Sequence, residues 1–285
     1  MDGFLCIDKP LGPSSFAVTS EVRKKLGIKK IGHAGTLDPY ASGLLVLALG
    51  KYTRLIQYLP AEPKIYVFSV LFGFTTDTLD LEGKVSQSKG AIPGEKSLEL
   101  ALETFAGEQL QVPPLYSAVK VNGTRAYKLA RSGSEVQLKG RKITIHSLRL
   151  IDYNQSGGEA QLELVCSGGT YVRSVARDLA EKLGTFGVVS KLRRTAAGVF
   201  SVDHAVKPEN LSAGENYIIS SAKVFRDFSH TVTQEEKEIL KTGRNIDLPH
   251  NSIKKGHLFA FDQSGKLVAV LKPQNDQLHP EKVFI

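Results

Sequence analysis

The sequence predicts an α+β fold in which a mixed, mainly antiparallel central sheet is flanked by helices and loops, with a small, mostly-β domain at the C-terminus. Strand-like and helix-like segments follow one another without the strict strand-helix-strand alternation of a parallel α/β protein. The chain also lacks the Gly-x-Gly-x-x-Gly and phosphate-loop motifs of nucleotide-binding folds. Two segments of alternating hydrophobicity, residues 141–152 and 160–166, surround a Gly-Gly turn, which indicates an antiparallel hairpin.

The N-terminal region predicts a strand, a rigid loop and a helix. Residues 4–7 are strand-like, and the two prolines within 8–13 stiffen the loop that follows. A serine at position 14 or 15 can cap a helix that continues to Leu26, because apolar residues recur there every four positions. Gly27 supplies the stop signal for this helix.

Residues 32–43, Gly-His-Ala-Gly-Thr-Leu-Asp-Pro-Tyr-Ala-Ser-Gly, place one carboxylate, Asp38, in a turn-prone loop. The apolar run 44–49 predicts a strand that holds this loop against the core. A rigidly held loop suits a catalytic side chain. An Asp-Pro pair more often serves only to form a turn, so both interpretations of Asp38 stay open at this point.

The remaining elements of the larger region follow from periodicity and from turn residues. Residues 64–73 alternate apolar side chains on both faces, as expected of a central strand that is covered on both sides. Two helices are predicted over 97–106 and 124–132, each opened by a hydroxyl cap and closed by Gly107 or Gly133. Prolines make residues 112–118 between them a stiff loop. A further helix is predicted from a strand-to-helix junction at Tyr171 and Arg173 to Gly184.

A turn-rich stretch over residues 204–216 favours a domain boundary. We therefore divide the 285 residues into a larger domain, 1–212, and a smaller one, 213–285. Strand-like segments at 258–261 and 267–271 are joined by Asp-Gln-Ser-Gly, which predicts a mostly-β structure for the smaller domain.

The composition, with 41% hydrophobic and 23% charged residues, is that of an ordinary soluble globular protein. The longest apolar stretches fall far short of the roughly 20 residues of a membrane helix, and no secretory signal is visible, so we expect a cytoplasmic protein without a membrane span. Cys6 and Cys166 lie in apolar segments and are expected to be buried thiols. The histidines and cysteines show no metal-ligand spacing, so no metal is predicted.

The net charge of +8 is unevenly distributed. Residues 1–214 carry 27 Lys and Arg against 20 Asp and Glu, whereas the rest carries 10 against 9. A basic domain attracts polyanions, and nucleic acid is the natural candidate. The alternative is a solvated helix face. The densest positive cluster comprises Arg23, Lys24, Lys25, Lys29 and Lys30.

Six motifs follow one another along residues 3–200. They are Asp8-Lys9-Pro10-x-Gly-x-Ser-Ser, Gly32-His33-x-Gly-x-Leu37-Asp38-Pro39-x-Ala-x-Gly43, Lys64-x-Tyr66 with Thr76-Asp77-Thr78-x-Asp80, Val112-Pro113-Pro114-x-Tyr116-Ser117-Ala118-x-Lys120, Gly169-Thr170-Tyr171-x-Arg173, and Leu192-Arg193-Arg194-Thr195. This set resembles the motifs of bacterial TruB-type tRNA pseudouridine synthases. Other pseudouridine synthase families typically carry an Arg-Leu-Asp core, so Thr36-Leu37-Asp38-Pro39 points to this branch.

The resemblance implies a pseudouridine synthase-like fold and isomerisation of the uridine at position 55 in the TΨC loop of tRNA. The N1 glycosidic bond is broken, the uracil rotates, and C5 joins the ribose. No redox change occurs, so no cofactor is expected. Asp38 would act at the sugar as a nucleophile or as a base, and the residues leave both roles open. Arg173 beside it would lower the pKa of Asp38 and keep the carboxylate ionised.

The same resemblance assigns the other site residues and gives the smaller domain the expected character of a PUA-like RNA-binding appendage. A base inside a folded RNA loop must first be flipped out, and aromatic stacking can offset that cost. Accordingly Tyr66 would stack under the flipped uracil, His33 would fill the space it vacates, Tyr171 would line the pocket, Leu192 would pack against the uracil, Lys9 would support the Asp38 loop, and Asp80 would contact RNA or a water molecule.

Two other functions are alternatives to the isomerase. A non-catalytic RNA-binding or RNA-folding module has no evident need for Asp38, Tyr66 and Arg173 together. A base-excising glycosylase would want a second carboxylate of raised pKa, and the motifs offer none that stands out. The sequence therefore favours an enzyme that acts on tRNA, and we expect it to be a monomer.

Overall fold

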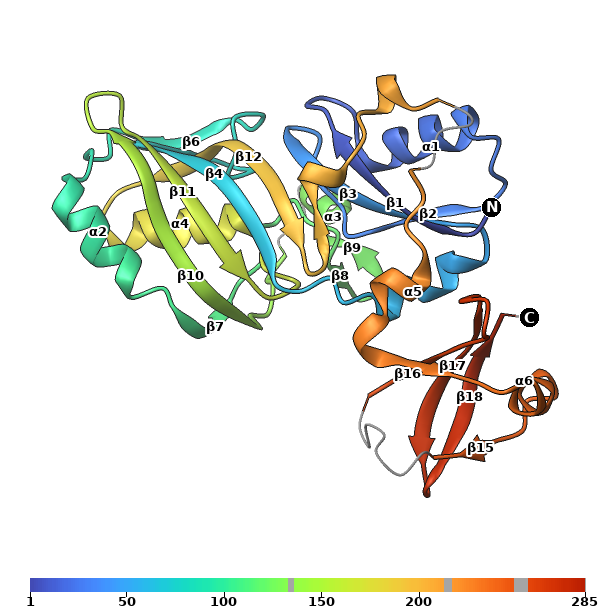
Figure 1. The fold of residues 1–285 in the computed structure, drawn as a ribbon. Helices are drawn as coiled ribbons and strands as arrows, with labels where there is room; N and C mark the ends of the chain where they lie inside the picture. Colours follow the sequence, from blue (N-terminus) through green and yellow to red (C-terminus); the bar gives the residue numbers. More distant parts are fainter. Residues whose placement is uncertain (133–135, 213–216, 249–255, 285) are drawn as a thin grey trace.

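The computed structural model describes residues 1–132, 136–212, 217–248 and 256–284. Within these ranges the chain forms one nine-stranded sheet with helices packed on it and one five-stranded sheet toward the C-terminus (Figure 1). In the larger sheet the described strand pairs are antiparallel except for β12 and β3, which run in parallel. The predicted α+β class with a mainly antiparallel sheet is confirmed.

The path of the larger sheet places β4 at its centre, as the sequence predicts. Two short strands lie off this path: β2 (Ile31–Ala34) pairs with β3, and β13 (Phe200–Ser201) pairs with β12. In spatial order the path consists of β1 (Gly3–Lys9), β3 (Ala41–Leu49), β12 (Gly187–Ala197), β4 (Lys64–Phe72), β11 (Glu159–Cys166), β10 (Arg141–Asn154) and β7 (Gly107–Gln111).

The helices and the smaller strand pairs complete the fold. No helix in the described ranges is long and apolar enough to cross a membrane. The α-helices are α1 (Ser15–Lys25), α2 (Glu95–Glu103), α3 (Ala126–Arg131), α4 (Val172–Lys182), α5 (Ser221–Val224) and α6 (Gln234–Lys241), and a long 3-10 helix, η1, spans Gly50–Tyr58. The two separate hairpins are β5 (Phe74–Thr76) with β6 (Val85–Ser88), and β8 (Lys120–Val121) with β9 (Thr124–Arg125).

Helix α1 begins where the sequence predicts. The Ser14 hydroxyl accepts a hydrogen bond from Ala17 N at 3.1 Å, which satisfies one of the free amides of the first turn. The helix ends at Lys25, and Gly27 follows with φ of +61°, a conformation that glycine adopts without steric cost.

Two of the predicted helices begin at other residues than expected. Helix α2 begins at Glu95 rather than at residue 97, and its N-cap is Gly94, which offers no hydroxyl. Helix α3 begins at Ala126 rather than at Thr124, because Thr124 and Arg125 pair with β8 in a hairpin. The glycine predicted to close α3, at position 133, lies outside the described residues.

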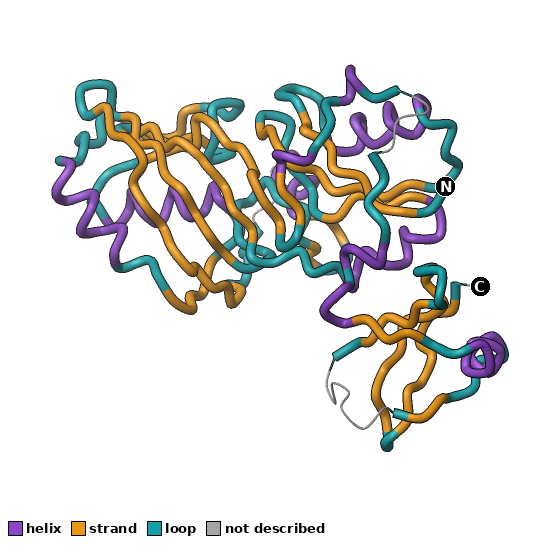
Figure 2. Tube along the Cα trace, in the orientation of Figure 1, coloured by secondary structure: helices purple, strands orange, loops and turns teal. Residues whose placement is uncertain are grey.

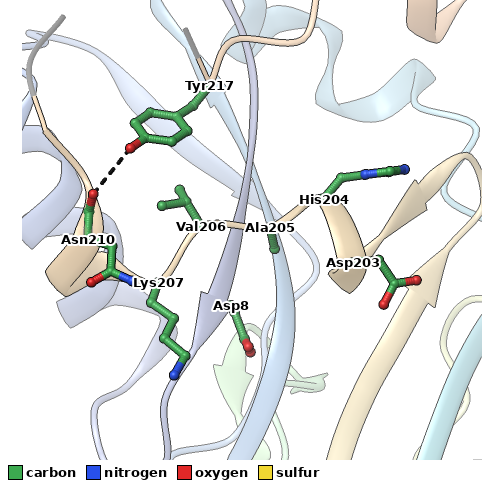
Figure 3. Close-up of a pocket in the computed structure, with 8 residues that line it drawn as sticks. All are labelled: Asp8, Asp203, His204, Ala205, Val206, Lys207, Asn210 and Tyr217. Atoms are coloured by element: carbon green, nitrogen blue, oxygen red, sulfur yellow. Dashed lines mark hydrogen bonds between the residues drawn. The ribbon is translucent and has the colours of Figure 1, made fainter. Parts of the chain in front are cut away.

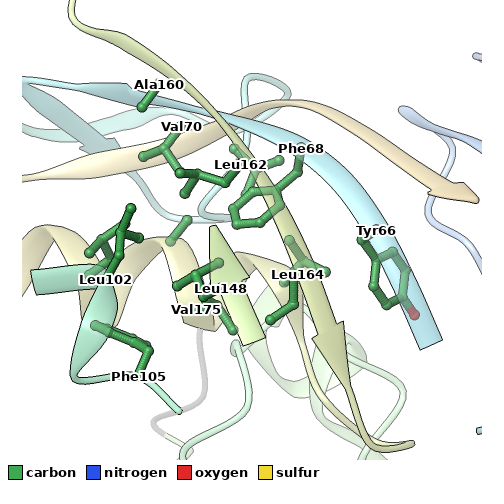
Figure 4. Packing of buried hydrophobic residues seen from close by; sticks show 14 of the residues in the cluster. Tyr66, Phe68, Val70, Leu102, Phe105, Leu148, Ala160, Leu162, Leu164 and Val175 are labelled. Carbon is green, nitrogen blue, oxygen red and sulfur yellow. The ribbon is translucent and has the colours of Figure 1, made fainter. Parts of the chain in front are cut away.

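The apolar core between the larger sheet and helices α2 and α4 explains why β4 is covered unequally (Figure 4). Both helices pack on the face that carries Tyr66, Phe68 and Val70, so these side chains are buried. On the opposite face Ser69 is buried, whereas Ile65 and Val67 are half-buried. The second face of the strand is therefore covered less completely than the prediction of a strand covered on both sides implies.

The C-terminal sheet is set apart from the larger sheet and meets it through helical segments (Figure 2). Its core joins the larger unit at Phe225 and Phe259, whose rings stack with centroids 3.7 Å apart. Before this junction Ile219 pairs with Phe4 of β1. Residues 213–216, at the predicted domain boundary, lie outside the described ranges, and the division at residue 212 stays a prediction. The sheet consists, in order, of β14 (Ser229–Thr231), β16 (Leu258–Phe261), β17 (Leu267–Gln274), β18 (Gln277–Val283) and β15 (Ile246–Asp247).

Replacing a core leucine tests this packing. Leu162 on β11 is fully buried, and we expect Leu162→Ala to lower the free energy of unfolding by about 2–5 kcal/mol, because a cavity remains where the side chain was. Leu110→Ala on β7, where the side chain is 71% exposed, is the matched control and should change stability by less than ~0.5 kcal/mol. Urea denaturation of both variants measures the difference, and equal losses would contradict the assigned core.

Candidate active site

The loop that carries Asp38 joins β2 to β3 and is fastened to the start of α1. The Ser15 hydroxyl donates to Leu37 O and accepts from Leu37 N, both at 2.8 Å. Gly12 N donates to Pro39 O at 2.9 Å. These bonds reach the residues on both sides of Asp38, so the loop is held on the rigid edge of the sheet, as a functional side chain requires.

Lys9 lies beneath the same loop and is completely buried. Its ammonium group donates to Ala41 O at 2.6 Å, Pro39 O at 3.2 Å and Pro10 O at 2.9 Å. Burial lowers the pKa of Lys9 to about 8, although the negative charge of Asp38 acts in the opposite direction. These contacts fit the supporting role expected of Lys9.

Arg173 is the centre of the polar network at this site. Its side chain is 6% exposed and extends from the first turn of α4. The guanidinium makes ion pairs with Asp38 Oδ2 at 3.0 Å and with Asp80 Oδ2 at 3.4 Å. It also donates to Thr78 O at 2.8 Å and to Tyr116 O at 3.0 Å. The Asp38 loop, the loop with Thr78 and Asp80, the loop with Tyr116 and helix α4 therefore meet at one buried cation.

Asp80 is the second carboxylate of this network, although the resemblance implied for it a contact with RNA or a water molecule rather than an ion pair with Arg173. Its side chain is 5% exposed and accepts hydrogen bonds from Thr78 Oγ1 at 2.5 Å and from Glu82 N at 3.0 Å. The side chain of Asp38, in contrast, is 38% exposed. Of the two acids that share Arg173, Asp38 is thus the one that a substrate can reach.

The electrostatics of Asp38 correct one expectation from the sequence. Burial raises the pKa of Asp38 above its ordinary value, and the nearby Arg173 offsets only part of this rise. The Asp80 carboxylate contributes further to the increase in pKa. The lowering effect expected of Arg173 is therefore present, but the net pKa of Asp38 is raised, because desolvation and a second carboxylate outweigh one guanidinium.

Tyr66 and Leu192 belong to the apolar cluster that also contains Leu37, directly before the candidate acid. Tyr66 lies on β4 and is buried. Leu192 lies on β12, where it pairs with Ala41 on one side and Phe68 on the other. The fold thus brings both residues to the same side of the Asp38 loop.

Arg194 is a buried residue of this region that sequence reasoning did not single out. Its guanidinium donates to Leu44 O at 2.8 Å and to Gly35 O at 3.1 Å. Gly35 has φ of +86°, and a Cβ there would lie 3.3 Å from Arg194 Nη1, so this position favours glycine. Arg194 follows Leu192 by two positions, which places both side chains on the same, inward face of β12. This spacing is the sequence feature that could have indicated a buried charge.

His33 and Tyr171 are less directly connected to the acid. His33 lies on β2 rather than in the predicted loop, because this segment pairs with β3. Burial, with the positive charge of Arg194, lowers the pKa of His33, and its Nδ1 has no hydrogen-bond partner in the described part of the chain. Tyr171 caps α4, where the Gln111 side chain bonds both its N and its O, at 2.8 and 3.2 Å. Among the described residues, no hydrogen bond or ion pair joins either one to Asp38.

Tyr40 is another residue of the site that the sequence did not indicate. Its hydroxyl is buried near Arg173 and Asp38 and has no hydrogen-bond partner among the residues that the structure describes. Burial raises the pKa of Tyr40 well above its ordinary value, so the phenol stays neutral.

A surface hollow beside β1 does not contain this network. It is an open depression of about 460 Å³ beside β1 (Figure 3). Asp8, which lines it, is engaged in a bidentate ion pair with Arg193, with both oxygens at 2.9 Å. Asp38 and Arg173 do not line this hollow. The hollow is therefore separate from the Asp38 network, to which the chemistry is assigned. The hollow is lined by Asp8, Asp203, His204, Ala205, Val206, Lys207, Asn210 and Tyr217.

Comparison with known proteins identifies the family. Residues 23–172 match the family described as TruB family pseudouridylate synthase (N terminal domain). The tRNA pseudouridine synthase B of Ehrlichia chaffeensis is 36% identical, with 100% of this chain and 99% of that protein covered. The protein of the same name from Borreliella burgdorferi (strain ZS7) is 41% identical over 79% of each chain. A chain in the crystal structure of a Cbf5-Nop10-Gar1 complex is 25% identical with a TM-score of 0.74, over 99% of this chain and 85% of that one. The chain belongs to the TruB family of pseudouridylate synthases.

Proposed function

We propose that this enzyme converts uridine to pseudouridine at position 55 in the TΨC loop of tRNA, with Asp38 as the catalytic residue. The observation that carries the proposal is the contrast between two carboxylates on one guanidinium. Asp38 is held at 3.0 Å from Arg173 and remains accessible, whereas Asp80 is buried on the same cation. The full-length relatives named tRNA pseudouridine synthase B support tRNA as the substrate.

The reaction exchanges one bond to the ribose for another and requires an anionic group beside the sugar. The bond between N1 and C1′ breaks, the uracil rotates, and a bond forms between C5 and C1′, while the proton on C5 is lost and N1 gains one. An anionic group beside the electron-poor ribose favours the cleavage, and Asp38 supplies it as a nucleophile or as a base at the sugar. The Arg173 ion pair orients the carboxylate for either role.

Access to the bond requires that the uridine leave its stack, which costs a few kcal/mol. In this proposal Tyr66 stacks on the flipped uracil, and Leu192 packs against it. Tyr171 lines the pocket and His33 occupies the vacated space. Stacking on an aromatic ring is worth roughly 1–3 kcal/mol per base, which offsets much of the cost of flipping.

The two domains divide these tasks. We assign the chemistry to residues 1–212 and RNA binding to the PUA-like residues 213–285. The five-stranded sheet of the second region rests on η1, where Arg54 donates to Val283 O at 2.9 Å and lies 4.8 Å from the centre of the Phe284 ring. Contacts of this kind hold both regions in one orientation toward a single RNA.

Asp38→Asn tests the catalytic assignment. We expect pseudouridine formation to fall by at least roughly 10²-fold, the lower range for loss of a positioned acid or base, while the Kd for tRNA stays close to that of the parent. Chromatography of nucleosides from digested tRNA measures turnover, and a tRNA with cytidine at position 55 is the matched substrate control. Turnover at the parental rate in the variant would refute the role of Asp38, and release of free uracil by the parent would indicate a glycosylase.

The pH profile tests the coupling between the two acids. Asp38 acts as the anion, so kcat/KM falls as the pH drops through its pKa. Because the Asp80 charge raises that pKa, Asp80→Asn should move the acidic limb to lower pH. Asp77→Asn removes an exposed charge from the same loop and serves as the control, with no shift expected. An acidic limb that stays in place in Asp80→Asn would contradict the coupling.

A further inference from the structure

Helix α1 links the candidate active site to the most basic segment of the chain. Its first turn is fastened to the Asp38 loop through Ser15 and Leu37. Its 11 residues rise by about 16 Å at 1.5 Å per residue, so the last turn lies about that far from the turn that is fastened to the Asp38 loop. The helix therefore has a fixed distance and direction from Asp38.

The end of α1 that is fastened to the Asp38 loop presents apolar side chains to solvent. Phe16, in the first turn, is 76% exposed, and Leu11, in the preceding loop, is 66% exposed. The backbone next to both residues is anchored, because Ser15 bonds Leu37 and Gly12 bonds Pro39. An exposed phenyl ring on a rigid support is a stacking platform, since every nucleobase offers a π-face to it.

The opposite end of α1 presents positive charge. Arg23 and Lys24 lie in the last turn, and Lys29 and Lys30 follow after the helix ends; all four are exposed. Lys25 differs from them because it pairs with Glu21 at 3.2 Å and donates to Pro208 O. The described structure shows no ion pair for the four exposed cations, so their charge is available to a polyanion.

We propose that α1, with its two flanking loops, is a contact surface for the RNA strand that neighbours the target uridine. Phe16 stacks on a base adjacent to the flipped nucleotide, and Lys29 and Lys30 bind phosphates further along the strand. Charge complementarity and the anchoring of Phe16 to the catalytic loop select RNA as the occupant. The inference rests on the proposed function, because it requires an RNA held at Asp38.

The two kinds of contact differ in their dependence on salt. Binding of phosphates by cations releases counterions, so each lost contact reduces the slope of log Kd against log salt by about 0.7–0.9. Stacking of a base on a phenyl ring releases none. A stacking variant should therefore weaken binding equally at every salt concentration, whereas a phosphate-contact variant should weaken it most at low salt.

The experiment measures the Kd of the full-length protein for a hairpin with the sequence of the tRNA T-arm, over a series of salt concentrations. We expect Phe16→Ala to weaken binding by about 5- to 140-fold with an unchanged salt slope, the fold-change that ~1–3 kcal/mol of stacking predicts. Phe16→Tyr keeps the ring and should bind like the parent. The double variant Lys29→Gln, Lys30→Gln should reduce the slope by about 1.4–1.8.

Leu100→Ala is the matched control, because this exposed apolar residue lies on α2 at the opposite end of the molecule and should not change the Kd (Figure 1). A parental Kd for Phe16→Ala, or a parental slope for the double lysine variant, would overturn the proposal. A parent protein that dimerises through Phe16, detected by sedimentation, would also overturn it. Absence of pseudouridine formation by a parent that binds the hairpin would refute the proposed function, and the two failures are thus distinguishable.

Discussion

The buried guanidinium of Arg173 is the interaction on which the geometry of the candidate site depends. A cation removed from water needs charged partners and hydrogen-bond acceptors, and removing a partner typically costs about 3–5 kcal/mol. Arg173 satisfies this need with Asp38, Asp80 and two backbone carbonyls from separate loops. The requirement of one cation thereby fixes the relative positions of four chain segments.

Two further buried cations extend the same construction beneath the Asp38 loop. Lys9 binds carbonyls directly after the acid, and Arg194 binds the carbonyl of Gly35 before it, together with that of Leu44 on the following strand. Backbone carbonyls that would otherwise lack partners are satisfied in this way. The loop is therefore held from both sides, and its single exposed carboxylate is oriented before any substrate binds, which is the condition for efficient positioning.

The arrangement also separates the roles of the charged groups. Asp80 and Arg173 are buried and set the electrostatic environment, whereas the side chain of Asp38 is partly exposed. The raised pKa of Asp38 shows that desolvation outweighs its ion pair. Helix α1 is fastened to the Asp38 loop through Ser15 and Leu37, so the RNA contacts proposed for its basic end would be built on the same rigid unit as the acid.

Local patterns along the chain were sufficient for much of this picture. Alternation identified the central strand and the hairpin of residues 141–166, Ser14 and Gly27 marked the ends of α1, and the Asp-Pro loop drew attention to Asp38. These features depend on neighbours within a few residues, which the sequence displays directly. The sharing of Arg173 by Asp38 and Asp80, the inward position of Arg194 and the net direction of the Asp38 pKa depend on segments up to 159 residues apart and on burial. Only the tertiary fold decides these, because desolvation and ion pairing arise from packing in space rather than from order along the chain.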